Sequence, residues 1–278
     1  MVVGGGAQVG EALSAAIPAL EASGVDTPRL DAEVLLAGIT DIDRARMISE
    51  PTLEMEPAHA REFATAIRRR CAREPVAYIL GRKGFRYVEL EVDQRVLVPR
   101  PETELLVEVA LELEPASVLE IGTGSGAIAL AIADEMPEAE VTATDVSAGA
   151  LVMARRNAAR LGSLGRIRFV EASLPASGRF DLIVANLPYV AETEHLEPEI
   201  TKFEPRGAVF GGPTGLEVFE SVLPQLAASA IESPVIALEI GRDQAADVGA
   251  LLRSAGWDKV ETRADLSGHD RVVIGRMS

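Results

Sequence analysis

The chain has 278 residues, 47% of them hydrophobic and 25% charged, which is enough for one large α/β domain with a smaller companion. Its formal net charge of −16 disfavours a protein whose main task is to bind nucleic-acid phosphates. The single cysteine, Cys71, excludes an intrachain disulfide and a cysteine metal cluster, which fits a reducing cytoplasm. With no signal-peptide pattern and no apolar run of about 18 residues, we expect a protein that is neither exported by that route nor membrane-spanning.

The first part of the chain, up to about residue 75, has apolar residues at helical spacing with turn signals between them. This pattern predicts a small helical domain whose last helix covers 57–73, because Pro75 prevents its continuation. Arginines gather at 68–73 with glutamates on either side, and we interpret them as a solvated helix face rather than a binding patch.

Residues 78–98 change to β-type alternation interrupted by glycines, which predicts a hairpin between two domains. We therefore expect a helical domain at 1–76, a hairpin linker at 77–100 and a second domain at 101–278.

The second domain alternates between strand and helix patterns. Strands are expected at 118–121, 141–144, 167–171, 180–185, 235–240 and 271–274, and helices at 126–135, 148–161, 216–229 and 244–255. Such alternation predicts an α/β fold with a mostly parallel, doubly wound sheet. Ligands of these sheets bind beyond the carboxyl ends of the strands, at the switch point.

A glycine-rich turn follows the first of these strands: Gly122, Thr123, Gly124, Ser125 and Gly126. Glycine permits a tight turn and lets a ligand approach the backbone, although tight packing of strand on helix would also explain it. The turn lacks the Gly-Lys-Ser/Thr of a P-loop, and its spacing is not that of dinucleotide binders. A cofactor without pyrophosphate is therefore favoured.

Asp145 ends the next strand, about 20 residues beyond the glycines, where a carboxylate can accept both hydroxyls of a ribose. The alternative is a helix cap. Because Ser147 is the better cap for the helix that begins near residue 148, we expect Asp145 to be left for the ribose.

A third feature is the apolar strand 181–185, which runs directly into Asn186, Leu187, Pro188 and Tyr189. Taken alone, these would be a turn former, a strand stop and a packed ring. Combined with the other two strand ends, they favour a catalytic site.

The three features together resemble class I S-adenosylmethionine-dependent methyltransferases that act on planar nitrogens. Longer segments, among them "VLVPRPETE", "EIGTGSGAIALAIA", "FDLIVANLPYV" and "DLSGHDRVVIGR", resemble the HemK/PrmC family more closely, and the first of these is the most discriminating. The resemblance spans roughly residues 70–276.

The family transfers a methyl group from S-adenosyl-L-methionine to the side-chain amide nitrogen (N5) of the glutamine in the Gly-Gly-Gln loop of class I peptide chain release factors, with S-adenosyl-L-homocysteine as product. The resemblance implies a Rossmann-like domain with a mostly parallel seven-stranded sheet, and an all-helical N-terminal domain, joined by a β-hairpin, that helps dock the release factor. We thus expect a cytoplasmic, monomeric enzyme of translation termination that does not bind membranes and for which nucleic acid is a disfavoured partner.

The resemblance also implies residue roles. The Asn186 side-chain oxygen and the Leu187 carbonyl would accept the two N–H groups of the amide, Pro188 would aim them, and Tyr189 would stack on the amide. The family has proline at the position of Leu187, which still offers the carbonyl. The implied cofactor contacts are Gly122, Thr123, Gly124, Ser125, Gly126, Asp145, Ser173 and Asn186. No metal is expected, since the three histidines are scattered.

Two other functions stay open. The same quartet serves N6-adenine methyltransferases of nucleic acid, against which the net charge counts, and Leu187 could mark a cofactor-binding homologue with weakened catalysis. Two acidic positions are also open: Glu104 could cap a helix or line the cofactor pocket, and Glu239 could face the cleft or pair with Arg242.

Overall fold

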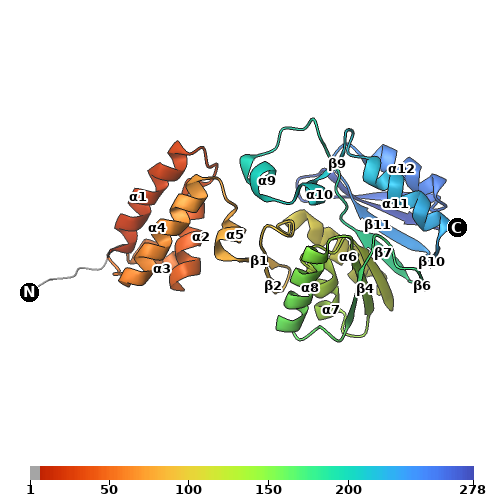
Figure 1. The fold of residues 1–278 in the computed structure, drawn as a ribbon, viewed down its shortest axis with the longest axis horizontal. Coiled ribbons are helices and arrows are strands. Elements are labelled where there is room, and N and C mark those ends of the chain that lie inside the picture. Colours follow the sequence, from red (N-terminus) through yellow and green to blue (C-terminus); the bar gives the residue numbers. More distant parts are fainter. Residues whose placement is uncertain (1–6) are drawn as a thin grey trace, which may run out of the picture. The chain divides into compact units, whose positions relative to one another are not determined.

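The computed structural model describes residues 7–278, which form two compact units (Figure 1). The smaller unit comprises the chain up to Gly81 together with Glu197–Phe203, and the larger comprises Arg82–Leu196 and Glu204–Ser278. A short segment from the second half of the sequence thus completes the N-terminal unit.

The smaller unit is helical. Its helices are α1 (Val9–Ala22), α2 (Pro28–Thr40), α3 (Arg44–Ser49), α4 (Pro57–Cys71), α5 (Val76–Leu80) and α9 (Pro198–Phe203). Proline occupies the first turn of α2 and α4, where its missing N–H leaves no helical bond unmade. The apolar faces of α1, α2 and α4 enclose a core around Leu20, Leu35 and Phe63. The expected helical character of this part is therefore present.

Two sequence-based details of this unit are wrong. Helix α4 ends at Cys71 rather than residue 73, because Arg73 takes a left-handed conformation with φ of 71°. Residues 78–80 belong to helix α5 and not to a strand, since Tyr78 is buried on a helical turn that Gly81 ends at φ of 71°. Three residues of alternation are too few to distinguish the two periods.

The sequence had suggested that the arginines at 68–73 form a solvated helix face, which is wrong for Arg70 and Arg73, although Arg68 is exposed. Arg70 is 6% exposed and pairs with Asp31 and with Glu199 of α9, each at 2.6 Å. Arg73 pairs with the same Glu199 at 2.7 Å and with Glu197 at 2.8 Å. The partners of Arg73 lie 126 and 124 positions away and Asp31 lies 39 positions from Arg70, which explains why local patterning failed to reveal these pairs.

The larger unit begins with the hairpin β1 (Arg82–Phe85) and β2 (Val88–Glu91). Its helices are η1 (Pro101–Thr103), α6 (Glu104–Leu113), α7 (Ala127–Glu135), α8 (Ala148–Arg160), α10 (Arg206–Val209), α11 (Glu217–Ala228) and α12 (Ala245–Ser254). Its remaining strands are β3 (Ser117–Ile121), β4 (Glu140–Asp145), β5 (Ile167–Glu171), β6 (Ser177–Arg179), β7 (Leu182–Ala185), β8 (Val190–Ala191), β9 (Phe210–Gly212), β10 (Ala230–Glu232), β11 (Val235–Glu239), β12 (Lys259–Ala264) and β13 (Asp270–Arg276).

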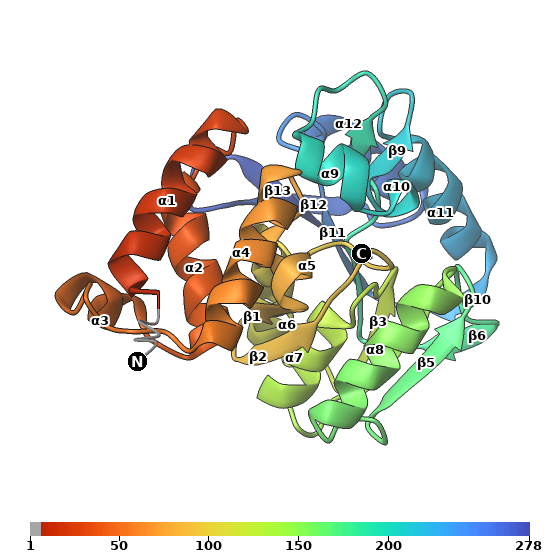
Figure 2. The same ribbon diagram turned by 60° about the vertical axis from the view of Figure 1, so that its left-hand side comes forward.

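Within the described residues, seven strands form one sheet, part of which is labelled in Figure 2. Their order is β12-β13-β11-β7-β3-β4-β5. Pairing is parallel from β11 to β5, and β13 runs antiparallel to both of its neighbours. The chain leaves β3 toward β4 and β5 and later returns to β3's other side as β7, so the switch point lies between β3 and β7. The predicted α/β fold class with a mostly parallel sheet is confirmed.

Helices cover both faces of this sheet. Alternate residues of each central strand enter two different cores: Val118 and Leu182 pack with α6 and α7, whereas Leu119 and Ile183 pack with α11 and α12. Burial on both faces makes these strands continuous apolar runs, which is why their sequence pattern was clear.

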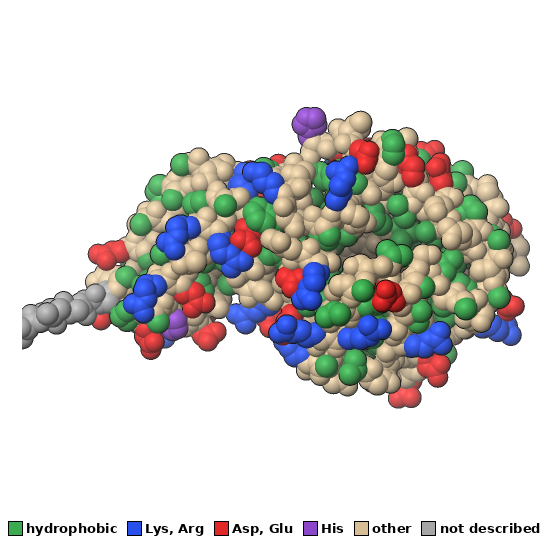
Figure 3. Space-filling view, in the orientation of Figure 1, with side chains coloured by type: hydrophobic (Ala, Val, Ile, Leu, Met, Phe, Trp, Pro, Cys, Tyr) green, Lys and Arg blue, Asp and Glu red, His purple; other side chains and the backbone are tan. Residues whose placement is uncertain are grey.

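Strand β12 was missed because it is an edge strand whose residues are exposed or only half-buried. Its sequence, KVETRA, therefore lacks the apolar run of the inner strands. On the surface drawn in Figure 3, acidic and basic side chains both occur on each unit. None of the described helices is long and apolar enough to cross a membrane.

Candidate active site

The glycine turn after β3 has two accessible positions and three buried ones. Gly122 and Gly124 have φ of 75° and 56°, and a Cβ added to Gly124 would meet no atom within 4 Å. Gly126 is different: its Cβ would lie 3.0 Å from Leu130 and 3.3 Å from Ala154. The first two glycines therefore shape an open cradle, whereas the third is required by close packing of α7 and α8.

Thr123 and Ser125 stabilise the turn from inside. Both are buried, and the Thr123 hydroxyl donates to Glu120 Oε2 at 2.6 Å, which also accepts the Ala129 N–H at 3.1 Å. Burial raises the pKa of Glu120 to about 8 against the opposing effect of these two hydrogen bonds. The Ser125 carbonyl accepts from the Asn157 side chain at 2.9 Å.

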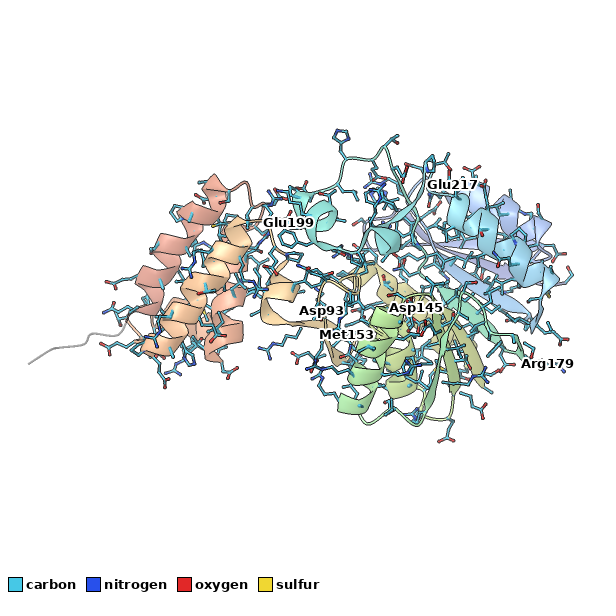
Figure 4. The ribbon with its side chains drawn as sticks, in the orientation of Figure 1. Asp93, Asp145, Met153, Arg179, Glu199 and Glu217 are labelled. Carbon is cyan, nitrogen blue, oxygen red and sulfur yellow. The ribbon has the colours of Figure 1, made fainter. Side chains whose placement is uncertain are left out.

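Asp145, at the end of β4, is half-buried and holds the turn in place (Figure 4). Its Oδ2 accepts the Gly124 N–H at 2.9 Å, and its Oδ1 accepts the Ser147 N–H at 2.8 Å. Ser147 in turn caps α8 by accepting the Ala150 N–H at 3.2 Å. Ser147 therefore caps the helix, as expected. Asp145, which was expected to be left for a ribose, also stabilises the turn through these two hydrogen bonds. Each of its oxygens keeps a second lone pair.

Ser173 follows β5, next to the end of β4. Ser173 is exposed, and its carbonyl accepts from the Thr144 hydroxyl at 3.3 Å. The N–H of the preceding residue, Ala172, donates to the Asp145 carbonyl at 3.1 Å. The ends of β3, β4 and β5 thus converge at one edge of the sheet.

The quartet after β7 lies directly beside the glycine turn. Ile121 pairs with Ala185 in the parallel ladder, so Gly122 and Asn186 leave adjacent strands at the same level. A Cβ on Gly122 would lie 3.6 Å from Leu187 Cδ2 and 3.8 Å from the Asn186 carbonyl oxygen. The starts of the two strands are aligned as well, because the Ser117 N–H donates to Asp181 Oδ2. The glycine turn and the quartet therefore meet at the switch point.

Inside the quartet, the polar groups have defined partners. Asn186 Nδ2 donates to Thr103 Oγ1 at 3.0 Å, and the Tyr189 hydroxyl donates to Glu239 Oε1 at 3.1 Å. The Tyr189 carbonyl accepts from Gln244 Nε2 at 2.9 Å. Burial and the neighbouring Glu239 charge raise the pKa of Tyr189, so its hydroxyl stays protonated. Leu187 is 5% exposed and packs into the core on the α11 and α12 side.

The structure gives hydrogen-bond partners to both acidic positions that the sequence left open. Glu239 is 1% exposed and accepts from Tyr189, rather than pairing with Arg242. Glu104 accepts the backbone N–H of Arg86 in the hairpin turn at 2.9 Å, so one of its oxygens stabilises the hairpin.

Thr103 is the site residue that sequence reasoning missed. It was not among the predicted site residues, yet it is 4% exposed and contacts Asn186. Its position within the distinctive "VLVPRPETE" segment was the signal that could have revealed it. Across residues 7–278 we find no group of three or more His, Cys, Asp and Glu side chains that could hold a metal.

Fold and site geometry together define a class I methyltransferase. Residues 101–203 match the family described as "Methyltransferase small domain", and residues 11–81 match the "PrmC N-terminal domain". In fold, the larger part of the chain is similar to the hMettl16 catalytic domain, solved with the MAT2A 3′UTR hairpin 6, with a TM-score of 0.55 at 15% identity over 80% of this chain and 83% of that one.

More specific are two curated relatives, both named release factor glutamine methyltransferase. The protein of Caulobacter vibrioides is 39% identical, with 95% of each chain covered, and that of Bordetella pertussis is 42% identical over 89% of this chain and 94% of its own. The chain belongs to the release factor glutamine methyltransferase family.

Proposed function

We propose that this protein methylates the N5 amide nitrogen of the glutamine in the Gly-Gly-Gln loop of class I release factors, with S-adenosyl-L-methionine as methyl donor. The observation that carries the proposal is the orientation of Asn186 beside the cradle: Nδ2 is engaged by Thr103, which leaves Oδ1 to accept a substrate N–H. The names of the curated relatives support the same substrate.

The residues at the strand ends fit the cofactor. Gly122 and Gly124 leave an accessible backbone at the switch point, where a Cβ would otherwise occupy the cradle at Gly124. Asp145 has spare acceptor capacity for ribose hydroxyls, and Ser173 borders the same edge. When bound, S-adenosyl-L-methionine supplies an electrophilic methyl group on a sulfonium. Of the buried positions, Thr123, Ser125 and Gly126 would act by holding the turn.

The substrate amide is a weak nucleophile, because its lone pair is delocalised into the carbonyl. Asn186 Oδ1 and the Leu187 carbonyl would accept its two N–H groups and hold the nitrogen facing the cofactor. As positive charge develops on that nitrogen, these preorganised acceptors stabilise it more than they stabilise the ground state. Pro188 restricts the backbone that aims them, and the Tyr189 ring, held through its hydroxyl, would cover the planar amide and exclude water.

We also propose that residues 1–76 dock the release factor, with 77–100 as the connecting hairpin region and 101–278 as the catalytic domain, and that the protein acts as a cytoplasmic monomer. Because the net charge is −16, protein is favoured over nucleic acid as the substrate.

The test is incubation of the purified protein with labelled S-adenosyl-L-methionine and a release factor, beside the same factor with its loop glutamine changed to alanine. We expect label on the intact factor alone, at its loop glutamine. Asn186→Ala, which removes the acceptor, should lower kcat by roughly 100-fold or more, while the cofactor still binds through its other contacts at the glycine turn and Asp145. No label on either factor, despite cofactor binding, would refute this function, and label on DNA or RNA would replace it.

A further inference from the structure

Three segments that are far apart in the sequence meet behind the Asn186 to Tyr189 quartet. Thr103 ends η1 and Glu239 ends β11, and both side chains are buried. Asn186 contacts the first and Tyr189 contacts the second, through the bonds of 3.0 and 3.1 Å. Glu239 is thus connected to one end of the quartet directly.

Thr103 is the residue that can connect Glu239 to the other end, because its side chain lowers the pKa of Glu239 against the effect of burial. As oriented here, Glu239 Oε2 is buried with no hydrogen-bond partner among residues 7–278. A buried carboxylate oxygen without a donor is costly, and the rotatable Thr103 hydroxyl is available to supply the donor.

The polarity of these bonds has a consequence for Asn186. An ionised carboxylate only accepts hydrogen bonds, so the Tyr189 hydroxyl donates to Glu239, and the Thr103 hydroxyl can satisfy Oε2 only as a donor. The Thr103 oxygen then has only lone pairs left, and Asn186 can satisfy it only with its NH₂ group. Without Glu239, the same hydroxyl could equally donate to Asn186 Oδ1, and the amide would turn its NH₂ toward the substrate.

We propose that Glu239 is a positioning residue, which sets the direction of the Asn186 amide through Thr103 and the plane of the Tyr189 ring through its hydroxyl. This inference rests on the proposed function, in which Asn186 Oδ1 accepts a substrate N–H. Glu239 itself touches neither the substrate nor the cofactor.

The electrostatic surroundings add a pH dependence. Burial raises the pKa of Glu239 to about 7, against the hydrogen bonds from Thr103 and Tyr189 and the positive charge of Arg271, while the charge of Glu102 raises it further. Arg271 is itself paired with Asp265 at 3.2 Å. Below this pKa the carboxyl carries a proton that it can donate to Thr103. The Thr103 hydroxyl is then free to donate to Asn186 Oδ1, and the orientation of the Asn186 amide is no longer fixed. We therefore expect kcat to fall as the pH decreases through about 7.

The experiment compares Glu239→Gln, Thr103→Val and Thr103→Ser with the unaltered protein, with release factor and labelled S-adenosyl-L-methionine as substrates. Gln keeps the shape but adds a donor, Val removes the hydroxyl and Ser restores it. The control is Ser233→Ala, which removes a buried hydroxyl bond to the Val235 carbonyl, beside the opposite end of β11.

We expect E239Q and T103V to lower kcat about 10- to 100-fold, because small misplacements of a reacting group have effects of this size. The cofactor Kd should stay within about threefold, the acidic limb of the kcat profile should disappear in E239Q, and T103S should recover most of the rate. S233A should lower only the melting temperature.

Unchanged kcat in E239Q, or an acidic limb that persists in it, would overturn the positioning role. So would equal losses of cofactor affinity and thermal stability, because these would indicate a merely structural residue. Failure of the proposed function itself is recognised separately, since the unaltered protein would then transfer no label to the release factor glutamine.

Discussion

Leu187 presents two groups to its surroundings, a buried side chain and a backbone carbonyl. The side chain is 5% exposed and approaches the glycine turn, whereas the proposed catalytic group is the carbonyl, which every residue has. The position therefore allows packing and catalysis to be separated by one substitution.

We predict that Leu187→Ala lowers the free energy of unfolding by about 2 kcal/mol, because it removes buried methyl groups and leaves a cavity. At a temperature well below unfolding, kcat should change by less than about fivefold, since the carbonyl acceptor is retained. Urea denaturation and single-turnover methylation measure the two effects. A loss of kcat as large as that of Asn186→Ala would show that the leucine side chain itself aligns the site.

Glu120 gives a second prediction, on stability against pH. Its pKa is about 8 in the folded protein, mainly because of burial, and near 4.5 when unfolded, so the folded state binds more protons between these values. Stability contributed by this group therefore falls as the pH rises from about 4.5 to about 8. Gln at this position stays neutral, and its single carbonyl oxygen can accept both bonds that Oε2 now accepts.

We accordingly expect the difference in melting temperature between Glu120→Gln and the unaltered, cofactor-free protein to become more favourable to the variant between pH 5 and pH 8.5. Thermal scans at several pH values measure it. A difference that is constant with pH, or that moves the other way, would mean that Glu120 is ionised and well paired at neutral pH.

At the scale of elements, the short helix α9 is held by charge rather than by an apolar face. None of its residues is buried, yet Glu199 (labelled in Figure 4) forms ion pairs with Arg70 and Arg73. Both arginine side chains are largely buried. Burial opposes ionisation of Glu199, but the hydrogen bonds from Arg73 and Arg70 prevail, and its pKa is lowered. Removing this carboxylate leaves two buried guanidinium groups with fewer partners.

We predict that Glu199→Ala destabilises the contact of α9 with α4 by about 3 kcal/mol, the usual effect of breaking a buried ion pair. Hydrogen exchange of the α4 and α9 amides should become correspondingly faster. Glu232→Gln is the control, because its pair with Arg179 is 72% and 89% exposed and should contribute nothing measurable. Equal behaviour of the two variants would contradict the structural role of the Glu199 cluster.

On the scale of the whole molecule, the sequence predicted those features that depend on local periodicity. The inner strands were identifiable because both of their faces are buried, while the polar edge strand β12 was not. Glycine, aspartate and asparagine at successive strand ends predicted where the site would lie, because parallel strands place their carboxyl ends along one edge.

Contacts between distant segments could not be read in this way. The bonds from Asn186 to Thr103 and from Tyr189 to Glu239 span 83 and 50 positions, and no local pattern indicates which side chain each will meet. The same applies to the ion pairs of Arg73. The sequence predicted a solvated side chain, whereas the structure pairs it with Glu197 and Glu199. Periodicity specifies which face is buried, but not the polar partner that a buried group finds there.

The division into two units leads to a prediction about removal of the smaller one. All the proposed cofactor residues lie between Gly122 and Asn186, within the larger unit. A chain of residues 82–278 should therefore bind S-adenosyl-L-methionine with a Kd within about threefold of the full chain, measured by calorimetry. Its segment 197–203, without Arg70 and Arg73, should become sensitive to trypsin at Lys202.

Methylation of an intact release factor by this truncated chain should fall by roughly 100-fold in kcat/KM, because binding energy from docking away from the reacting glutamine would be lost. A short peptide that contains the Gly-Gly-Gln sequence does not use that docking surface, so both chains should methylate it at similar, low rates. If the truncated chain methylates the intact factor at the full rate, the helical unit has no part in substrate docking. If it loses the peptide as well, the unit instead supports the catalytic domain, because only a defect in the site itself removes both activities together.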